Sequence, residues 1–163
     1  MKRTIRMILC GLPALALAFG ILYLRGDIGI ARNRIAEDVR RDLPGGEILH
    51  VSCGKELAAV LVATDGAPSL RIYANRPGLS LGWFFRYGGP VPEGAVQRFI
   101  PEWGRERVYA ASGGHGVATD SPAGEEILSP VTDVPFVLVL PANAGAEFYD
   151  AAGKPVTFID RRL

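Results

Sequence analysis

The spacing of hydrophobic and polar residues changes twice along the chain and divides it into three parts. Residues 7–24 form a stretch without a charged side chain. Residues 28–43 repeat apolar side chains every three or four positions, which is the spacing of an amphipathic helix. After Gly46 the period falls to two and turn residues recur, which indicates short β-strands. We therefore expect an N-terminal anchor segment (1–27), a juxtamembrane amphipathic helix (28–43) and a β-rich domain (44–163).

The uncharged stretch 7–24 is long enough to cross a bilayer as a helix. Its eighteen residues would span about 27 Å, close to the roughly 30 Å hydrocarbon core. Lys2, Arg3 and Arg6 precede it, as in a signal anchor that keeps the N-terminus inside the cell. We favour such an uncleaved single-pass anchor in the cell membrane, with an extracytoplasmic domain, because apolar residues continue to Leu24. The alternative is a secretory signal cleaved after the small residues at 14–16 or 16–18, which would release a secreted protein.

The helix expected over 28–43 has one apolar and one charged face. The apolar positions are Ile28, Ala31, Ile35, Val39 and Leu43. On the charged face, Glu37 with Arg41 and Arg34 with Asp38 have the i,i+4 spacing of helical ion pairs. We favour packing of the apolar face on the following sheet. The alternative is a helix that lies on lipid or binds a partner.

The remaining chain reads as a series of short strands separated by turns. They are expected at 47–53, 56–64, 69–75, 79–87, 96–100, 105–112, 117–120, 125–129, 136–140, 146–150 and 155–160. Gly88-Gly89-Pro90 is expected to end one strand, and 113–116 to form a turn with His115 at its tip. The last two strands form the clearest hairpin. The fold class predicted is α+β, predominantly antiparallel, as a sandwich-like or partly closed barrel with one helix.

Charge and cysteine content exclude several classes of function. The chain has 18 Lys plus Arg against 17 Asp plus Glu, a formal net charge of +1, so it lacks the basic surface of a nucleic-acid-binding protein. Cys10 and Cys53 lie in the anchor and in the domain, which makes an intramolecular disulfide implausible. No glycine-rich phosphate-binding motif is present. We expect neither nucleic acid nor a cofactor as a ligand.

The most aromatic segment, 79–87, is the candidate ligand-binding site. On a regular strand Trp83, Phe85 and Tyr87 share one face. Together with Arg86 and Trp103 they would line a groove for a peptide, a glycan or a lipid headgroup by stacking and burial. The alternative is that these aromatic side chains belong to the core.

The candidate catalytic and metal-binding residues of the sequence form no complete motif. An exported hydrolase would use His115 or His50 as the base, Ser112 or Cys53 as the nucleophile and Asp120 as the orienting acid, but no known motif surrounds these residues. His50 and Cys53 are three positions apart on a strand and should face opposite sides, so no zinc site is expected. A group of acidic residues is expected to form a solvent-exposed edge, because their spacing does not match a calcium-binding loop. These residues are Asp120, Glu125, Glu126 and Asp133.

Several segments resemble small bacterial membrane-anchored proteins, mainly from Gram-positive lineages, to which no function is assigned. They are 81–89, 135–136, 148–150 and 153–156. The resemblance implies an N-terminal anchor and an exported β-rich domain, and it carries over no catalytic or ligand-binding residue. We expect a non-enzymatic module that binds another envelope protein or a surface ligand, with the exported hydrolase as the alternative.

Overall fold

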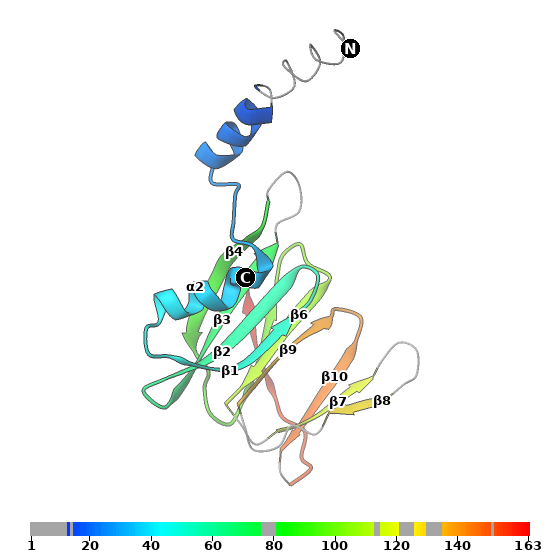
Figure 1. The fold of residues 1–163 in the computed structure, drawn as a ribbon. Coiled ribbons are helices and arrows are strands. Elements are labelled where there is room, and N and C mark those ends of the chain that lie inside the picture. Colours follow the sequence, from blue (N-terminus) through cyan, green and yellow to red (C-terminus); the bar gives the residue numbers. More distant parts are fainter. Residues whose placement is uncertain are drawn as a thin grey trace.

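Three β-sheets and a short helix on the surface of one of them make up the body of the molecule (Figure 1). The computed structural model describes residues 13, 15–75, 81–112, 115–120, 126–129, 135–150 and 152–163. Sheet I has the order β1 (Glu47–Cys53), β2 (Leu57–Thr64), β3 (Ala67–Asn75), β4 (Trp83–Pro90). Sheet II has the order β11 (Phe158–Arg162), β5 (Val96–Ile100), β6 (Glu106–Ala111), β9 (Phe136–Pro141). Sheet III has the order β10 (Gly145–Asp150), β7 (His115–Asp120), β8 (Glu126–Ser129).

The helical turn η1 (Arg32–Arg34) leads into α2 (Ile35–Asp42), which covers one face of sheet I. Ile35 and Val39 of α2 are buried against side chains of β2, β3 and β4, so packing on the sheet is confirmed. The helix is shorter than the predicted 28–43, because Ile28 and Ile30 form β-bridges with the beginning of β4 instead.

Sheets I and II pack face to face through a second apolar layer. This layer consists of Leu57, Ala59, Leu61, Leu70, Ile72, Ala74, Val91, Phe99, Val108, Ala110 and Val137. The opposite face of sheet II packs on β10 through a third cluster, in which Phe148 stacks on Phe136 at 5.7 Å between ring centres. The body is therefore layered in the order α2, sheet I, sheet II and sheet III.

Polar side chains of β1 bridge the two packed sheets along one edge. His50 Nδ1 accepts a hydrogen bond from the backbone N–H of Val137 at 3.2 Å, and Ser52 Oγ accepts one from Val139 at 2.9 Å. Both donors belong to β9, the edge strand of sheet II. The free N–H groups of that edge, which would otherwise be open to another strand, are thereby occupied.

The predicted α+β class with mainly antiparallel strands is confirmed. Of the two architectures predicted, a sandwich-like fold or a partly closed barrel, the described strands form separate sheets that pack face to face and no closed barrel. The predicted final hairpin is wrong in part. In the expected second strand, 155–160, only Pro155 pairs with β10, through a bridge to Tyr149. The chain then continues into β11, which pairs in parallel with β5. Asp160 fixes this position because Arg98 of β5 donates two hydrogen bonds to its carboxylate, both of 2.8 Å.

One predicted break and one predicted turn lie inside strands. Gly88-Gly89-Pro90 continues β4 and pairs with residues 69–71 of β3. A Cβ at Gly88 would lie 2.8 Å from an Arg71 nitrogen and 2.9 Å from the Phe85 ring, so glycine at this position makes room for those two side chains. His115 is the first residue of β7 and not the tip of a turn.

Candidate functional site

A β-bulge on β4 divides the predicted aromatic site between two faces of sheet I. Phe85 pairs with Tyr73 of β3, while Tyr87 pairs with its neighbour Ile72, so Arg86 is an extra residue. Such a residue resets the alternation of side chains along the strand. Phe85 keeps the face of Tyr73, and its ring lies edge-on to the Tyr73 ring at 5.7 Å.

Tyr87 consequently points into the layer between sheets I and II. Its ring centre lies 4.7 Å from that of Phe99 of sheet II. The prediction that Trp83, Phe85 and Tyr87 share one face is therefore wrong for Tyr87, because the prediction assumed a regular strand.

Trp83 belongs to the core beneath α2. Only 7% of its surface is exposed, and it packs in the same cluster as Ile35 and Val39. The Arg32 guanidinium covers its ring at 5.9 Å from the ring centre and also donates a hydrogen bond to the carbonyl oxygen of Cys53. The core interpretation is thus the one that fits Trp83.

Two aromatic residues of the predicted site remain accessible, and each is paired with an arginine. Phe85 is 47% exposed, with the Arg71 guanidinium 5.2 Å from its ring centre. Trp103, in the loop between β5 and β6, is 39% exposed, with the Arg86 guanidinium at 5.1 Å. Cation–π pairs of this kind hold the rings in place while leaving part of each surface free. Ligand binding by these residues stays a prediction.

A polar pocket of about 630 Å³ lies where the turn before β2, the loop before β6 and the residues after β9 meet. Its lining consists of Lys55, Glu56, Gly104, Arg105, Glu106, Pro141, Ala142 and Asn143. None of these residues was singled out from the sequence. They come together from three segments that no short motif connects.

The two glutamates of this pocket build its walls. The Glu106 carboxylate accepts hydrogen bonds from the backbone N–H groups of Lys55, Glu56 and Leu57 at 2.7, 3.0 and 2.9 Å. Glu56 Oε2 in turn accepts one from the backbone N–H of Arg105 at 2.6 Å. The Lys55 and Arg105 side chains form no ion pair with another described residue. Both cations are available to an anionic group.

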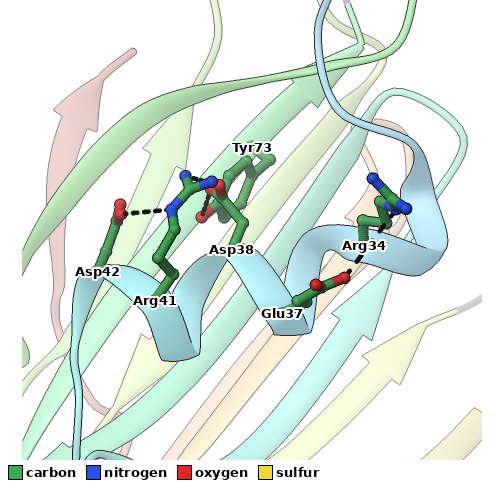
Figure 2. A network of polar contacts seen from close by, with 6 residues as sticks. All are labelled: Arg34, Glu37, Asp38, Arg41, Asp42 and Tyr73. Atoms are coloured by element: carbon green, nitrogen blue, oxygen red, sulfur yellow. Dashed lines mark hydrogen bonds and ion pairs between the residues drawn. The ribbon is translucent and has the colours of Figure 1, made fainter.

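A second polar network joins α2 to sheet I (Figure 2). The Tyr73 hydroxyl donates a hydrogen bond of 2.8 Å to Asp38, which also forms an ion pair with Arg41. Burial, followed by the neighbouring Asp38, raises the pKa of Tyr73 above its usual value. The ion pairs of α2 join Arg34 to Glu37 and Arg41 to Asp38 at i,i+3, so the predicted i,i+4 pairing is wrong. Tyr73 orients Asp38 from the sheet, and this network secures the helix.

The structure does not assemble the alternative hydrolase site from the side chains that it describes. Cys53 is exposed on one face of β1, and His50 lies on the opposite face, as predicted. The Ser112 hydroxyl donates a hydrogen bond to the carbonyl oxygen of Pro92 at 3.1 Å. The side chain of His115 lies outside the described part.

Among the described residues no three His, Cys, Asp or Glu side chains gather as metal ligands do. Glu125 and Asp133 lie outside these residues, as do the side chains of Asp120 and Glu126. The acidic edge expected from the sequence therefore stays a prediction.

The helical residues 15–24 project from the body (Figure 1). All of their side chains except that of Leu22 are exposed. The exposed fractions are 68% for Leu15, 68% for Leu17, 54% for Phe19, 48% for Ile21, 72% for Tyr23 and 86% for Leu24. None of the helices in the described part of the chain combines the length and the hydrophobicity of a membrane span. Residues 1–12 and 14 are not described, so the transmembrane helix expected over 7–24 stays a prediction.

Searches of protein-family models, of curated proteins and of solved structures return no match to this chain.

Proposed function

We propose that the chain is a membrane-anchored, extracytoplasmic binding module without catalytic activity. Residues 7–24 would hold it in the cell membrane with the N-terminus inside. The β-rich domain would bind another envelope protein or a surface ligand. The observation that carries this proposal is the exposure of the apolar side chains of residues 15–24.

A bilayer is the environment that fits such a helix. Burial of apolar surface is worth about 25 cal/mol per Å², and a helix that is apolar all round has no face suited to water. Lys2, Arg3 and Arg6 before the apolar stretch support an orientation with the N-terminus inside.

Binding is favoured over catalysis by the chemistry of the polar pocket. Its carboxylates accept backbone hydrogen bonds and serve as walls, while Lys55 and Arg105 have no ion-pair partner among the described residues. Two cations in the lining of this pocket suit a phosphate or carboxylate group of a ligand.

Flotation of the intact chain with phosphatidylcholine vesicles tests the anchor. We expect the protein to float with the vesicles and to stay bound in about 1 M salt, at which exposed charge–charge attractions are screened within about 3 Å. Recovery of the full-length chain in the aqueous fraction without detergent would refute the proposal. The mass of the mature protein separately distinguishes a retained anchor from a cleaved signal.

A further inference from the structure

The apolar helix is joined to the body without a flexible linker. It ends in a Schellman motif, in which Gly26, at φ +69°, donates to the Tyr23 carbonyl at 3.0 Å and Asp27 donates to the Leu22 carbonyl at 2.9 Å. Arg25 and Asp27 form an ion pair of 3.4 Å across this cap. The end of the helix is therefore fixed by backbone bonds.

The residues that follow cross the chain at Leu81 and Trp83, where β4 begins, and bond to both residues. Gly29 and Ile30 donate to the carbonyl oxygens of Leu81 and Trp83 at 2.6 and 2.9 Å. In return, Leu81 donates to Asp27 and Trp83 to Ile30, both at 2.8 Å. These bonds begin one residue after the helix cap, so the direction of the helix is tied to that of sheet I.

Strand order shows which end of the body adjoins the helix. β1 and β3 end there, and β2 and β4 begin there, because the four strands are antiparallel neighbours. The hydrogen bonds of Glu106 to residues 55–57 bring the beginning of β6 to the same end, and Glu106 pairs with Pro141 at the end of β9. We call this the helix-proximal end, and it contains the polar pocket.

The side chains exposed at the helix-proximal end suit the boundary between lipid and water. Leu81 is 47% exposed and Trp103 is 39% exposed. Lys55 and Arg105 line the polar pocket at this end of the body. Tryptophan prefers the headgroup level of a bilayer. A lysine or an arginine without an ion-pair partner can bind a lipid phosphate through charge-assisted hydrogen bonds.

We propose that the helix-proximal end rests on the headgroup layer of the bilayer, with Lys55 and Arg105 toward the lipid phosphates and Trp103 at the interface. This inference rests on the proposed membrane anchor and names the surface ligand of the pocket as a phospholipid headgroup. The opposite end of the body, with the turn at Glu93, then faces away from the membrane.

Two fluorescent probes on the full chain test this orientation. One labels Cys53, at the end of β1, in a Cys10→Ser background. The other labels Glu93→Cys with both native cysteines changed to serine. β3 joins the two ends and, with nine residues, spans about 27 Å at about 3.3 Å per residue. Both proteins are reconstituted into phosphatidylcholine vesicles that contain a lipid with a nitroxide on its headgroup.

We expect the nitroxide to quench the probe at Cys53 at least about threefold more than the probe at Glu93, given their separation of about 27 Å. Insertion of Gly-Ser-Gly-Ser between Gly26 and Asp27 should make the two values converge, because it frees the body from the helix. Equal quenching in the chain without the insertion would overturn the orientation and leave the anchor intact. Failure of the chain to float with the vesicles would overturn both proposals.

The contribution of the pocket is tested with Lys55→Gln combined with Arg105→Gln. Anionic lipid should increase the quenching of the Cys53 probe above its value in phosphatidylcholine vesicles, and this variant should lose that increase while the junction between the helix and the body keeps the difference between the two probes. Unchanged quenching would exclude the two cations as headgroup ligands. Lys154→Gln is the control, since this exposed residue lies in the turn after β10 and outside the pocket.

Discussion

Tyr73 shows how one hydroxyl group couples a surface helix to the sheet beneath it. Its ring is buried in the layer between α2 and sheet I, and its hydroxyl reaches Asp38 at 2.8 Å. Asp38 also binds Arg41 of the same helix. A single buried donor therefore holds Asp38, which in turn holds Arg41.

Tyr73→Phe should lower the free energy of unfolding by about 1.5–3 kcal/mol, the usual value of a hydrogen bond to a charged group. Urea denaturation followed by circular dichroism measures the loss. Tyr87→Phe is the matched control, because no described residue bonds the Tyr87 hydroxyl and its ring packs on Phe99. A similar loss in both variants would mean that the hydrogen bond of Tyr73 to Asp38 does not stabilise the fold.

Asp160 should make the docking of β11 sensitive to acid. The two hydrogen bonds from Arg98 hold the pKa of this carboxyl below its usual range, and Asp160 correspondingly raises the pKa of Arg98. A carboxyl whose pKa is lower in the folded than in the unfolded protein stabilises the fold above its ordinary pKa. This stabilisation is lost as the pH falls through the lowered value.

Asp160→Asn should therefore be less stable than the unchanged protein at pH 7, by no more than about 1 kcal/mol because the pair is partly exposed. The difference should shrink as the pH falls below the ordinary pKa of an aspartate, about 4, and through the lowered pKa of the folded protein. Thermal unfolding of both proteins across this range measures it. A difference that is independent of pH would show that the carboxylate charge is not its cause.

At the scale of elements, the sequence predicts most strands but not where each strand faces. The bounds of β1 and β5 agree with the alternation of polar and apolar residues and with the turns that flank them. A bulge at Arg86 sends Tyr87 into the core, and bulges leave no regular mark in a hydrophobic pattern. The partner of β11 is equally hidden, because its contact with β5 is set by Arg98, 62 residues away.

The pocket could not be predicted from the sequence, because its contacts are also made between distant residues. Glu106 binds backbone groups 49 to 51 residues away. Any acidic residue at the beginning of a strand has the same local sequence context. Only the packing of sheets I and II brings its carboxylate to the turn before β2.

Gly29 and Gly82 allow the chain to cross β4, and substitution of either should loosen the helix from the body. A Cβ at Gly29 would lie 2.4 Å from the Trp83 carbonyl oxygen, and one at Gly82, at φ +97°, 2.8 Å from that of Ile30. Gly29→Ala and Gly82→Ala should each cost about 1–3 kcal/mol, as overpacking does. Faster proteolysis between residues 25 and 31 should accompany the loss.

Gly20→Ala is the control for this crossing. A Cβ at Gly20 meets nothing within 4 Å, so the helix should tolerate it and gain a few tenths of a kcal/mol to about 1 kcal/mol in propensity. If Gly29→Ala had the same stability and the same rate of proteolysis as Gly20→Ala, the crossing would not be the element that fixes the helix.

At the scale of the whole molecule, the body buries its apolar residues in three clusters, whereas the N-terminal helix packs in none of them. Three clusters fill the spaces between α2 and the three sheets. The side chains of residues 15–24 belong to none of them. The uncharged stretch was also the clearest feature of the sequence, because a long apolar run needs no tertiary context to be recognised.

Leu17→Lys combined with Ile21→Lys should abolish membrane binding by the helix and leave the stability of the body unchanged. The two positions are one turn apart, and a lysine near the centre of a membrane helix, as at Leu17, costs about 2.5–3.5 kcal/mol. Flotation with vesicles should therefore be lost. The unfolding transition of the body should change by less than about 0.5 kcal/mol, as for exposed substitutions, because these side chains are 68% and 48% exposed. Leu17→Ile with Ile21→Leu should float normally. A double-lysine protein that still floats would refute the anchor, and one whose body unfolds would show that the helix packs on the sheets.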